Sequence, residues 1–235
     1  MKGLGDNPRE RILTAAADLL AREGRAGVST RTISSLAQVQ PPTIYRQFGD
    51  MEGLLDEVAS LGFNRYLESK LRLESSDDPV DALRQGWDLY VQFALANPAI
   101  YALMYAEPRR GARSPAAGRA AEILQGLVTQ IAEAGRLRVS VESAARMIQR
   151  CGVGVALTLI GDGDGAGDLR LSEMTREAVI SAITSSSTSG NEKRSEKDNA
   201  RQHAVALKAL LPKAAADFSP AERALLASWL DRLSG

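Results

Sequence analysis

Residues that could carry out chemistry are few in this chain. Its 235 residues include one histidine, His203, and one cysteine, Cys151, which together cannot assemble a Cys/His zinc site. Cys151 lies in an apolar run, and the sequence shows neither a Gly-x-Ser-x-Gly motif nor a metal-ligand spacing. The sequence therefore predicts no catalytic residue, no metal site and no cofactor, and an enzyme is a disfavoured alternative.

One acidic loop resembles a calcium-binding loop in its sequence. Residues 162–173 place acids at loop positions 1, 3, 7 and 12 and glycine at position 6, as an EF-hand does. Positions 5 and 9, however, are Ala166 and Arg170, and neither side chain can coordinate calcium. We interpret this segment as a solvated turn between two helices.

Residues 29–48 carry side chains that suit nucleic acid. They combine hydrogen-bond donors for phosphates and base edges with apolar surface that fits a thymine methyl group. Residues 1–48 hold seven Lys and Arg against four Asp and Glu, a net charge of +3, and the rest of the chain has a net charge of −3. An anionic partner would therefore meet the N-terminal part.

The apolar residues recur at helical spacing almost throughout, and strand signals are nearly absent. A first helix ends at Gly24 and Gly27, a short helix follows Ser29, and a third begins at Pro41. The last two form a predicted helix-turn-helix, whose second helix can enter the major groove. The apolar residues expected to face inward are Ile33, Leu36 and Ala37 of the first of these two helices and Ile44 and Phe48 of the second, with Val39 of the turn also part of the scaffold.

Prolines that follow a capping residue predict helix starts further along the chain, at residues 79, 98, 115 and 220. Two more apolar segments predict helices over about 141–160 and 172–185. The predicted fold is all-α. It comprises a helix-turn-helix domain (1–55), a larger helical ligand-binding and dimerisation domain (56–185), and a linker with a helical extension of unknown role (186–235).

Aromatic residues gather where the second of these domains begins. One interpretation is a hydrophobic core, and the other is an apolar ligand pocket to which tyrosine hydroxyl groups contribute hydrogen bonds. No lysine or arginine lies between Trp87 and Tyr105, so a ligand there would not be strongly anionic. The predicted ligand-binding residues are Trp87, Tyr90, Phe93, Tyr101, Met104, Tyr105, Met147 and Cys151.

The stretch from Ile33 to Leu55 resembles the DNA-binding domain of the tetracycline-repressor (TetR) family of bacterial transcription regulators. Thr43-Ile44-Tyr45-Arg46-x-Phe48 followed by Glu52-x-Leu54-Leu55 carries the resemblance, and the segment from Trp87 to Tyr101 is similar to one of the family's C-terminal domain types. Family membership implies a homodimer, formed through the helices near 141–160 and 172–185. It also implies a double-stranded DNA operator and a small-molecule effector as partners.

The resemblance assigns roles to single residues. Ser29 and Arg31 are expected to contact phosphate or the groove edge, and Arg46 ranks below Tyr45 because the family often turns it toward the scaffold. The predicted DNA-binding residues are Ser29, Arg31, Gln40, Pro41, Pro42, Thr43, Tyr45 and Arg46.

This chain departs from the family pattern at three positions. Gln38 stands where a turn glycine is usual, which would cost free energy if the backbone there is left-handed. Gln40 replaces a serine cap, and Met51 replaces a phosphate-binding lysine. These departures are the best support for an alternative function, a protein-interaction module that keeps the helix-turn-helix as scaffold.

The sequence predicts a transcriptional regulator, most often a repressor in this family, that acts in the cytoplasm. No apolar run approaches the roughly 20 residues that span a bilayer, so no membrane partner is expected. The basic loop 109–113 is interpreted as solvated. In the extension, Leu225, Leu226, Trp229 and Leu233 form an apolar stripe expected to be buried on the chain's own body or on a partner.

Overall fold

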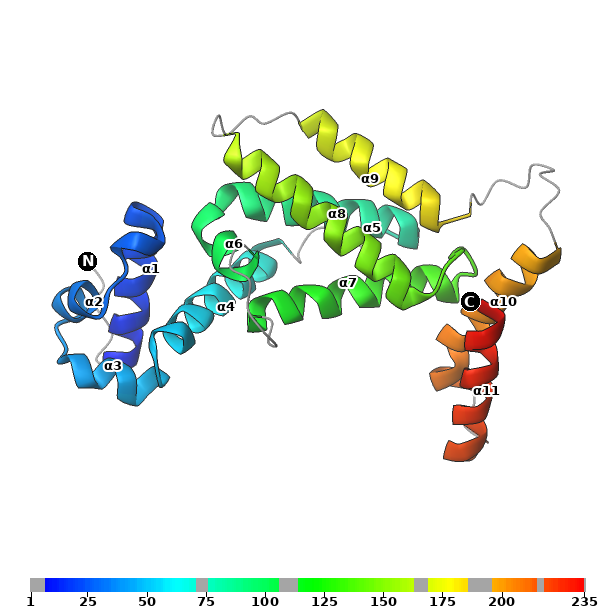
Figure 1. Ribbon diagram of the computed structural model, residues 1–235, viewed down its shortest axis with the longest axis horizontal. Helices are drawn as coiled ribbons and strands as arrows, with labels where there is room; N and C mark the ends of the chain where they lie inside the picture. Colours follow the sequence, from blue (N-terminus) through cyan, green and yellow to red (C-terminus); the bar gives the residue numbers. More distant parts are fainter. Residues whose placement is uncertain are drawn as a thin grey trace. The chain divides into compact units, whose positions relative to one another are not determined.

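The computed structural model describes residues 7–70, 76–105, 114–162, 169–185, 196–214 and 218–234. Most of these residues are helical and none lies in a strand, so the all-α prediction is confirmed (Figure 1). The helices are α1 (Pro8–Gly27), α2 (Thr30–Ala37), α3 (Pro41–Phe48), α4 (Met51–Lys70), α5 (Pro79–Ala96), α6 (Pro98–Tyr105), α7 (Pro115–Glu133), α8 (Val141–Gly161), α9 (Leu169–Ile183), α10 (Glu196–Ala214) and α11 (Pro220–Ser234).

The four helix starts predicted from proline are confirmed at α5, α6, α7 and α11. Asp78 caps α5, because its carboxylate accepts from the backbone N–H of Val80 at 2.7 Å. Ser219 caps α11, since its hydroxyl accepts from the N–H of Glu222 at 3.3 Å. Helix α9 begins three residues before the predicted position 172.

The chain divides into two compact units. The first, here the N-terminal unit, comprises residues 1–74 and 92–119, and the second, the C-terminal unit, comprises residues 75–91 and 120–235. The division by domains that the sequence predicts, at residues 55 and 185, remains a prediction.

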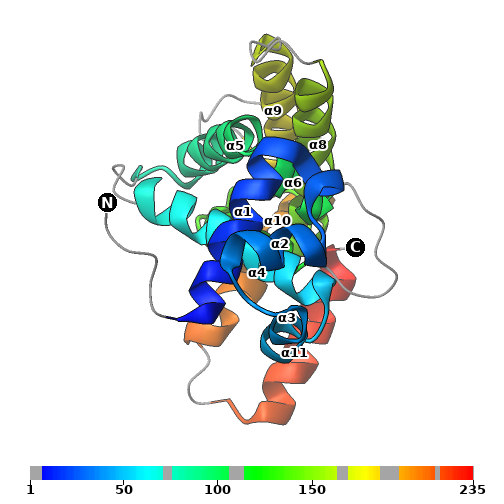
Figure 2. The ribbon, with the colours of Figure 1, turned by 90° about the vertical axis from the view of Figure 1, so that its left-hand side faces the viewer.

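In the N-terminal unit, α1, α2 and α3 pack against one another (Figure 2). Ile12 of α1, Ile33 of α2 and Ile44 of α3 are completely buried. Helix α6 packs against both α1 and α4. The approach of α6 to α4 is close, because a Cβ atom added at Gly62 would lie only 2.5 Å from Ile100 Cδ1.

In the C-terminal unit, α8 and α9 lie side by side and run antiparallel (Figure 1). Leu137, which precedes α8, forms an antiparallel bridge with Thr184, which follows α9. Trp87 of α5 packs on this pair. Its indole Nε1–H donates to Ser172 Oγ of α9 at 3.0 Å, and its ring faces Gly152 of α8.

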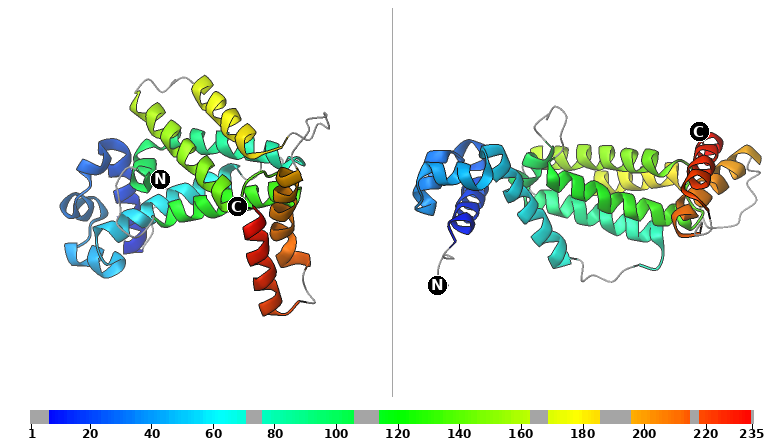
Figure 3. Two further views of the ribbon diagram at one scale, coloured as in Figure 1. Left: turned by 45° about the vertical axis from the view of Figure 1, so that its right-hand side comes forward. Right: turned by 90° about the horizontal axis from the view of Figure 1, so that it is seen from below.

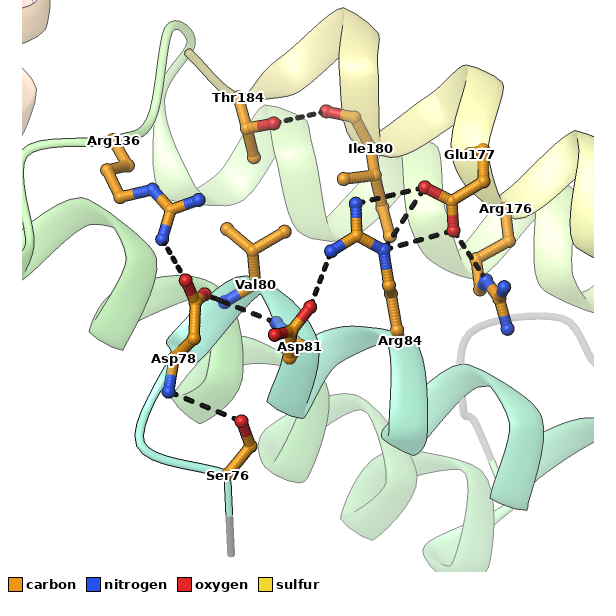
Figure 4. Close-up of polar contacts among 10 residues, drawn as sticks. All are labelled: Ser76, Asp78, Val80, Asp81, Arg84, Arg136, Arg176, Glu177, Ile180 and Thr184. Atoms are coloured by element: carbon orange, nitrogen blue, oxygen red, sulfur yellow. Dashed lines mark hydrogen bonds and ion pairs between the residues drawn. The ribbon is translucent and has the colours of Figure 1, made fainter. Parts of the chain in front are cut away.

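Ion pairs fasten α5 to α9 (Figure 4). The Arg84 guanidinium binds both carboxylate oxygens of Glu177 at 3.0–3.1 Å and also Asp81 at 2.6 Å. Arg176 pairs with Asp88 and, at 2.9 Å, with Glu177. The hydrogen bonds from Arg84, and to a lesser extent from Arg176, hold the pKa of the Glu177 carboxyl below its usual value.

A second charged contact fixes the start of α5. Arg136 donates to Asp78 at 2.7 Å (Figure 4). This bond, together with that from the N–H of Val80, lowers the pKa of the Asp78 carboxyl. Asp78 therefore joins the helix cap to the segment between α7 and α8.

Helices α10 and α11 pack against each other as a hairpin, seen in both views of Figure 3. Lys208 pairs with Asp231 across the hairpin at 2.6 Å, and Lys213 pairs with Glu133 at the end of α7 at 2.7 Å. Leu230 is buried, whereas Leu225, Trp229 and Leu233 are at least half exposed. The chain's own body therefore leaves most of the predicted apolar stripe uncovered.

The lowered pKa values of Glu177 and Asp78 predict acid sensitivity. Their charged forms are favoured by folding, so the stabilisation is present above the unfolded-state pKa of about 4 and is lost as the pH falls through the folded values. Arg84→Met should lower the free energy of unfolding at pH 7 by up to about 1 kcal/mol, because Arg84 and Glu177 are more than a third exposed and solvent screens the pair. Urea unfolding of wild type and Arg84→Met at pH 7 and pH 3 measures this change in the free energy of unfolding.

The difference between wild type and Arg84→Met should shrink between pH 7 and pH 3, because the pH then falls below the unfolded-state pKa of about 4 and toward the lowered pKa of the folded Glu177 carboxyl. Arg223→Met, which removes an exposed arginine of α11, is the matched control and should leave the pH dependence of wild type unchanged. An Arg84→Met difference that is constant with pH would show that the ion pairs do not contribute.

Candidate DNA-binding surface and effector site

A capping box starts α2. The Ser29 hydroxyl accepts from the backbone N–H of Thr32 at 3.2 Å, and the Thr32 hydroxyl accepts from the N–H of Ser29 at 3.0 Å. Two of the donors that a helix start leaves unpaired are satisfied in this way. The cap sets the position of Ser29 and Arg31, both of which are exposed.

The turn between α2 and α3 depends on Gln38. Its φ of 53° and ψ of 50° are left-handed, and it is the only non-glycine residue with positive φ among the described residues. The N–H groups of Gln38 and Val39 donate to the carbonyls of Ser35 (3.4 Å) and Ser34 (3.1 Å). The position is therefore left-handed, the condition under which the sequence analysis expected Gln38 to cost free energy.

Helix α3 begins without a side-chain cap. Gln40 occupies the cap position but makes no capping hydrogen bond, as expected of glutamine. Pro41 and Pro42 follow as the first two helical residues, and Gly49, with φ of 79°, ends the helix. The helix is held instead by Ile44, which is completely buried against the other two helices of the core.

The structure places the predicted DNA-binding residues at the surface. Ser29, Arg31, Gln40, Pro41, Pro42, Tyr45 and Arg46 are exposed, and Thr43 is half-buried. The predicted scaffold residues Ile33, Ala37 and Ile44 are buried, and Val39 and Phe48 are half-buried. The expectation that Leu36 faces inward is wrong, because its side chain is 52% exposed on the outer side of α2. Contact of the exposed set with DNA remains a prediction.

Tyr45 has a partner that sequence reasoning missed. Its ring is 47% exposed, and its hydroxyl shares a hydrogen bond with the hydroxyl of Thr30, with 3.0 Å between the oxygens. Thr30 lies 15 residues earlier on α2, and no local sequence signal links the two positions. The bond ties the exposed face of α3 to the start of α2.

The start of α4 is poor in positive charge. Asp50 caps it by accepting from the N–H of Gly53 at 2.7 Å, Met51 is half-buried, and Glu52 is exposed. Arg9 of α1 serves the scaffold, since its guanidinium lies 5.0 Å from the centre of the Phe48 ring and pairs with Glu57. Phosphate contact at this end would therefore rest on few cations.

Four of the predicted effector residues lie in the N-terminal unit. They are Phe93, Tyr101, Met104 and Tyr105. The ring of Phe93 lies 6.5 Å from that of Tyr101, which is 4.9 Å from that of Tyr105. Tyr101 is completely buried.

Sequence reasoning missed two aromatic residues of α4 that join this group. The Phe63 and Tyr66 rings lie 5.2 and 5.0 Å from that of Phe93. Burial raises the pKa of the Tyr66 phenol, so its hydroxyl keeps its proton. Helical spacing places Phe63 and Tyr66 three apart on one face of α4, a signal that could have been found in the sequence.

The other four predicted effector residues, Trp87, Tyr90, Met147 and Cys151, lie in the C-terminal unit. Trp87 is buried against α8 and α9, and Tyr90 and Cys151 are half-buried. Met147 is 41% exposed, and this exposure gives no support to the prediction that its side chain lines a pocket.

Helix α8 has an inner and an outer face. Gly152 belongs to the inner face, because a Cβ atom there would lie 3.6 Å from the Trp87 ring. Gly154 is exposed and has no neighbour within 4 Å of an added Cβ atom. Leu171 and Met174 of α9 are also exposed, Met174 by 68%.

The described residues contain no group of three His, Cys, Asp or Glu side chains that could hold a metal ion. Within the same part of the chain, every helix is too short or too polar to span a bilayer. The centre of the acidic loop, 163–168, and the basic loop 109–113 lie outside the described residues.

Two stretches of the chain match protein families. Residues 12–58 match the family described as "Bacterial regulatory proteins, tetR family", and residues 83–230, more than half of the chain, match "Tetracyclin repressor-like, C-terminal domain". The chain belongs to the TetR family. The second match extends through α10 and most of α11, so it takes in the segment that the sequence analysis described as an extension.

Known proteins resemble this TetR-family chain in part. The transcriptional repressor NicS of Pseudomonas putida is 38% identical over 94 residues, which are 37% of this chain and 43% of NicS. The chain matches less than half of the length of its curated relatives.

Two solved structures share the fold. A protein from Rhodococcus sp. RHA1 has a TM-score of 0.61 and 22% identity, and covers 79% of this chain and all of its own. The regulator FadR of Bacillus subtilis, solved in complex with stearoyl-CoA, has a TM-score of 0.60 and 18% identity, and covers 74% of this chain and 98% of its own.

The left-handed turn predicts a stabilising substitution. Gln38→Gly should raise the free energy of unfolding by up to about 1 kcal/mol. Glycine avoids the left-handed cost of about 1–2 kcal/mol, but it loses more backbone entropy on folding, which offsets part of the gain. Urea unfolding measures the change. Gln38→Ala keeps the left-handed strain and should bring no gain; an equal gain from alanine would place the cost in the glutamine side chain.

Proposed function

We propose that this protein is a dimeric transcriptional repressor of the cytoplasm that leaves its DNA operator when a small apolar or weakly polar effector binds. The observation that carries the proposal is the exposed face of α3, with Pro41, Pro42 and Tyr45, on a helix-turn-helix in a TetR-family chain. The buried Ile33 and Ile44 and the capped start of α2 hold this face in one position.

DNA binding would place α3 in the major groove. Exposed Arg31 and Arg46 provide cations for phosphates, and Tyr45 provides a rigid ring next to the bases. The acids at the start of α4 predict that few phosphates are neutralised. Since the salt dependence of affinity grows with the number of neutralised phosphates, it should be shallow.

The effector would bind at the aromatic residues. The group around Phe93 and Tyr101 is apolar with tyrosine hydroxyl groups, and no lysine or arginine lies between Trp87 and Tyr105. FadR, which shares the fold, was solved with stearoyl-CoA, whose acyl chain is apolar. That acyl chain, and not the anionic coenzyme A group, supports an effector with apolar surface.

The N-terminal unit contains a route for coupling. Helix α6, which carries Tyr101, packs against α1 and α4, and α1 packs against α2 and α3. An effector that shifts α6 would therefore move the scaffold of α3. Linkage requires that such an effector weaken DNA binding by the same factor by which DNA weakens effector binding.

Dimerisation would use the outer faces of α8 and α9. Gly154 permits close approach of another helix, and Leu171 and Met174 expose apolar surface in the single chain. Two copies of this helix pair would bury that surface in a four-helix arrangement. The two α3 helices of the dimer would then read two half-sites.

The alternative, a protein-interaction module, rests on the departures at Gln38, Gln40 and Met51. Gln38 gives this alternative little support, because the turn that it forms still has the helix-turn-helix geometry. Selection of duplexes from a random library with the full-length protein separates the two functions. Recovery of one sequence motif supports the repressor, and recovery of none contradicts it.

Tyr45 provides the sharpest test of the DNA surface. Tyr45→Ala should weaken binding to the selected duplex by about 10-fold or more, since a good base contact contributes about 1–3 kcal/mol. Its stability should change by less than about 1 kcal/mol, because the ring is exposed. Fluorescence anisotropy and urea unfolding measure the two quantities.

Tyr45→Phe removes only the hydrogen bond to Thr30 and serves as the matched variant. It should bind DNA more tightly than Tyr45→Ala. Wild-type affinity in Tyr45→Ala would remove this side chain from the contact surface.

The dimer surface predicts a second result. Met174→Glu should convert the dimer to monomer at micromolar concentration, because a buried unpaired carboxylate costs several kcal/mol. Leu225→Glu, at another exposed apolar site, on α11, should leave the dimer intact. Light scattering after size exclusion measures the mass; a dimer lost only in Leu225→Glu would place the interface on the C-terminal hairpin.

A further inference from the structure

The first turn of α3 offers no free backbone donor before Ile44. Pro41 and Pro42 have no N–H group, and the N–H of Thr43 donates to the carbonyl of Gln40 at 2.9 Å. A helix start ordinarily presents several N–H groups, which makes it a binding site for phosphate oxygens. At α3, the first three residues contribute no donor to such a site.

Apolar surface takes the place of these donors. The rings of Pro41 and Pro42 are exposed at the helix start, and the half-exposed ring of Tyr45 follows four residues after Pro41 on the same face of α3. The Tyr45 hydroxyl is hydrogen-bonded to Thr30, and the exposed ring adds apolar surface next to the two prolines.

The major groove presents a single apolar group to such a surface, the C5-methyl group of thymine. Resting on the proposed function, in which α3 enters the major groove, we propose that Pro41 and Pro42 read thymine methyl groups by apolar contact. Sequence preference at the base pairs that face the first turn of α3 then comes from these methyl groups and not from hydrogen bonds.

The charges near the start of α3 also favour apolar contact over phosphate binding at this turn. Asp50 and Glu52 lie at the start of α4, where Met51 offers no cation, so phosphate binding there adds little affinity. Gln40 does not cap the helix and leaves the proline rings uncovered. An operator without thymine opposite Pro41 and Pro42 would lose most of what this turn recognises.

Deoxyuridine tests the proposal because it differs from thymidine only by the C5-methyl group. A duplex is first selected with the full-length protein, and each thymine of a half-site is then replaced by deoxyuridine. We expect a loss of affinity of about fourfold at one or two positions, the change that corresponds to one buried apolar carbon, and no change at the others. Fluorescence anisotropy measures each dissociation constant.

Two variants assign the effect to the prolines. Pro41→Ala and Pro42→Ala keep a good helix former and remove the ring, so each should abolish the deoxyuridine penalty at the position that its proline reads. Pro79→Ala makes the same change at the start of α5 and is the control, which should keep every penalty.

Each other outcome overturns the inference. Equal affinity for thymidine and deoxyuridine duplexes shows that methyl groups are not read. A penalty that persists in both proline variants assigns the methyl contact to another side chain. Failure to select any duplex instead contradicts DNA binding itself, and is thereby distinguished from a failure of methyl readout alone.

Discussion

The turn that joins α2 to α3 closes with Gln38 in a left-handed backbone conformation, and the orientation of α3 depends on that turn. The conformation costs about 1–2 kcal/mol for a residue with a side chain. Burial of Ile33 and Ile44, each worth about 1.5–3 kcal/mol, exceeds that cost. Packing of the three-helix core therefore stabilises the left-handed turn. The turn orients α3 so that Pro41, Pro42 and Tyr45 are exposed.

The same unit contains both the exposed face of α3 and a group of aromatic residues. Tyr101 and Phe93 are buried next to α4, and α4 and α6 both contact α1. Close packing at Gly62 leaves little room for α6 to move without moving α4. In the C-terminal unit, the ion pairs between α5 and α9 hold the outward face of α9, which the proposed dimer would use, in a fixed register.

Local signals in the sequence predicted the elements well. Capping residues before proline located four helix starts, and the pattern of apolar residues in 29–48 located the helix-turn-helix, because both signals act within a few residues. Contacts between distant residues were not predicted. The Arg84–Glu177 pair joins residues 93 apart, and the Tyr45–Thr30 bond joins two helices whose crossing no periodicity specifies. Nor could the sequence show which face of α8 meets Trp87, since a helix that is apolar all round does not distinguish its two sides.

The central claim is that the first turn of α3 lies against thymine C5 positions in the major groove. Photo-crosslinking from 5-iododeoxyuridine, placed at single thymine positions of the selected duplex, tests it directly, because the iodine replaces the methyl group and light makes the C5 carbon that carried it reactive. Mass spectrometry of the crosslinked protein should find the bond within residues 41–46. Crosslinks confined to any other segment, with none in α3, would contradict the account.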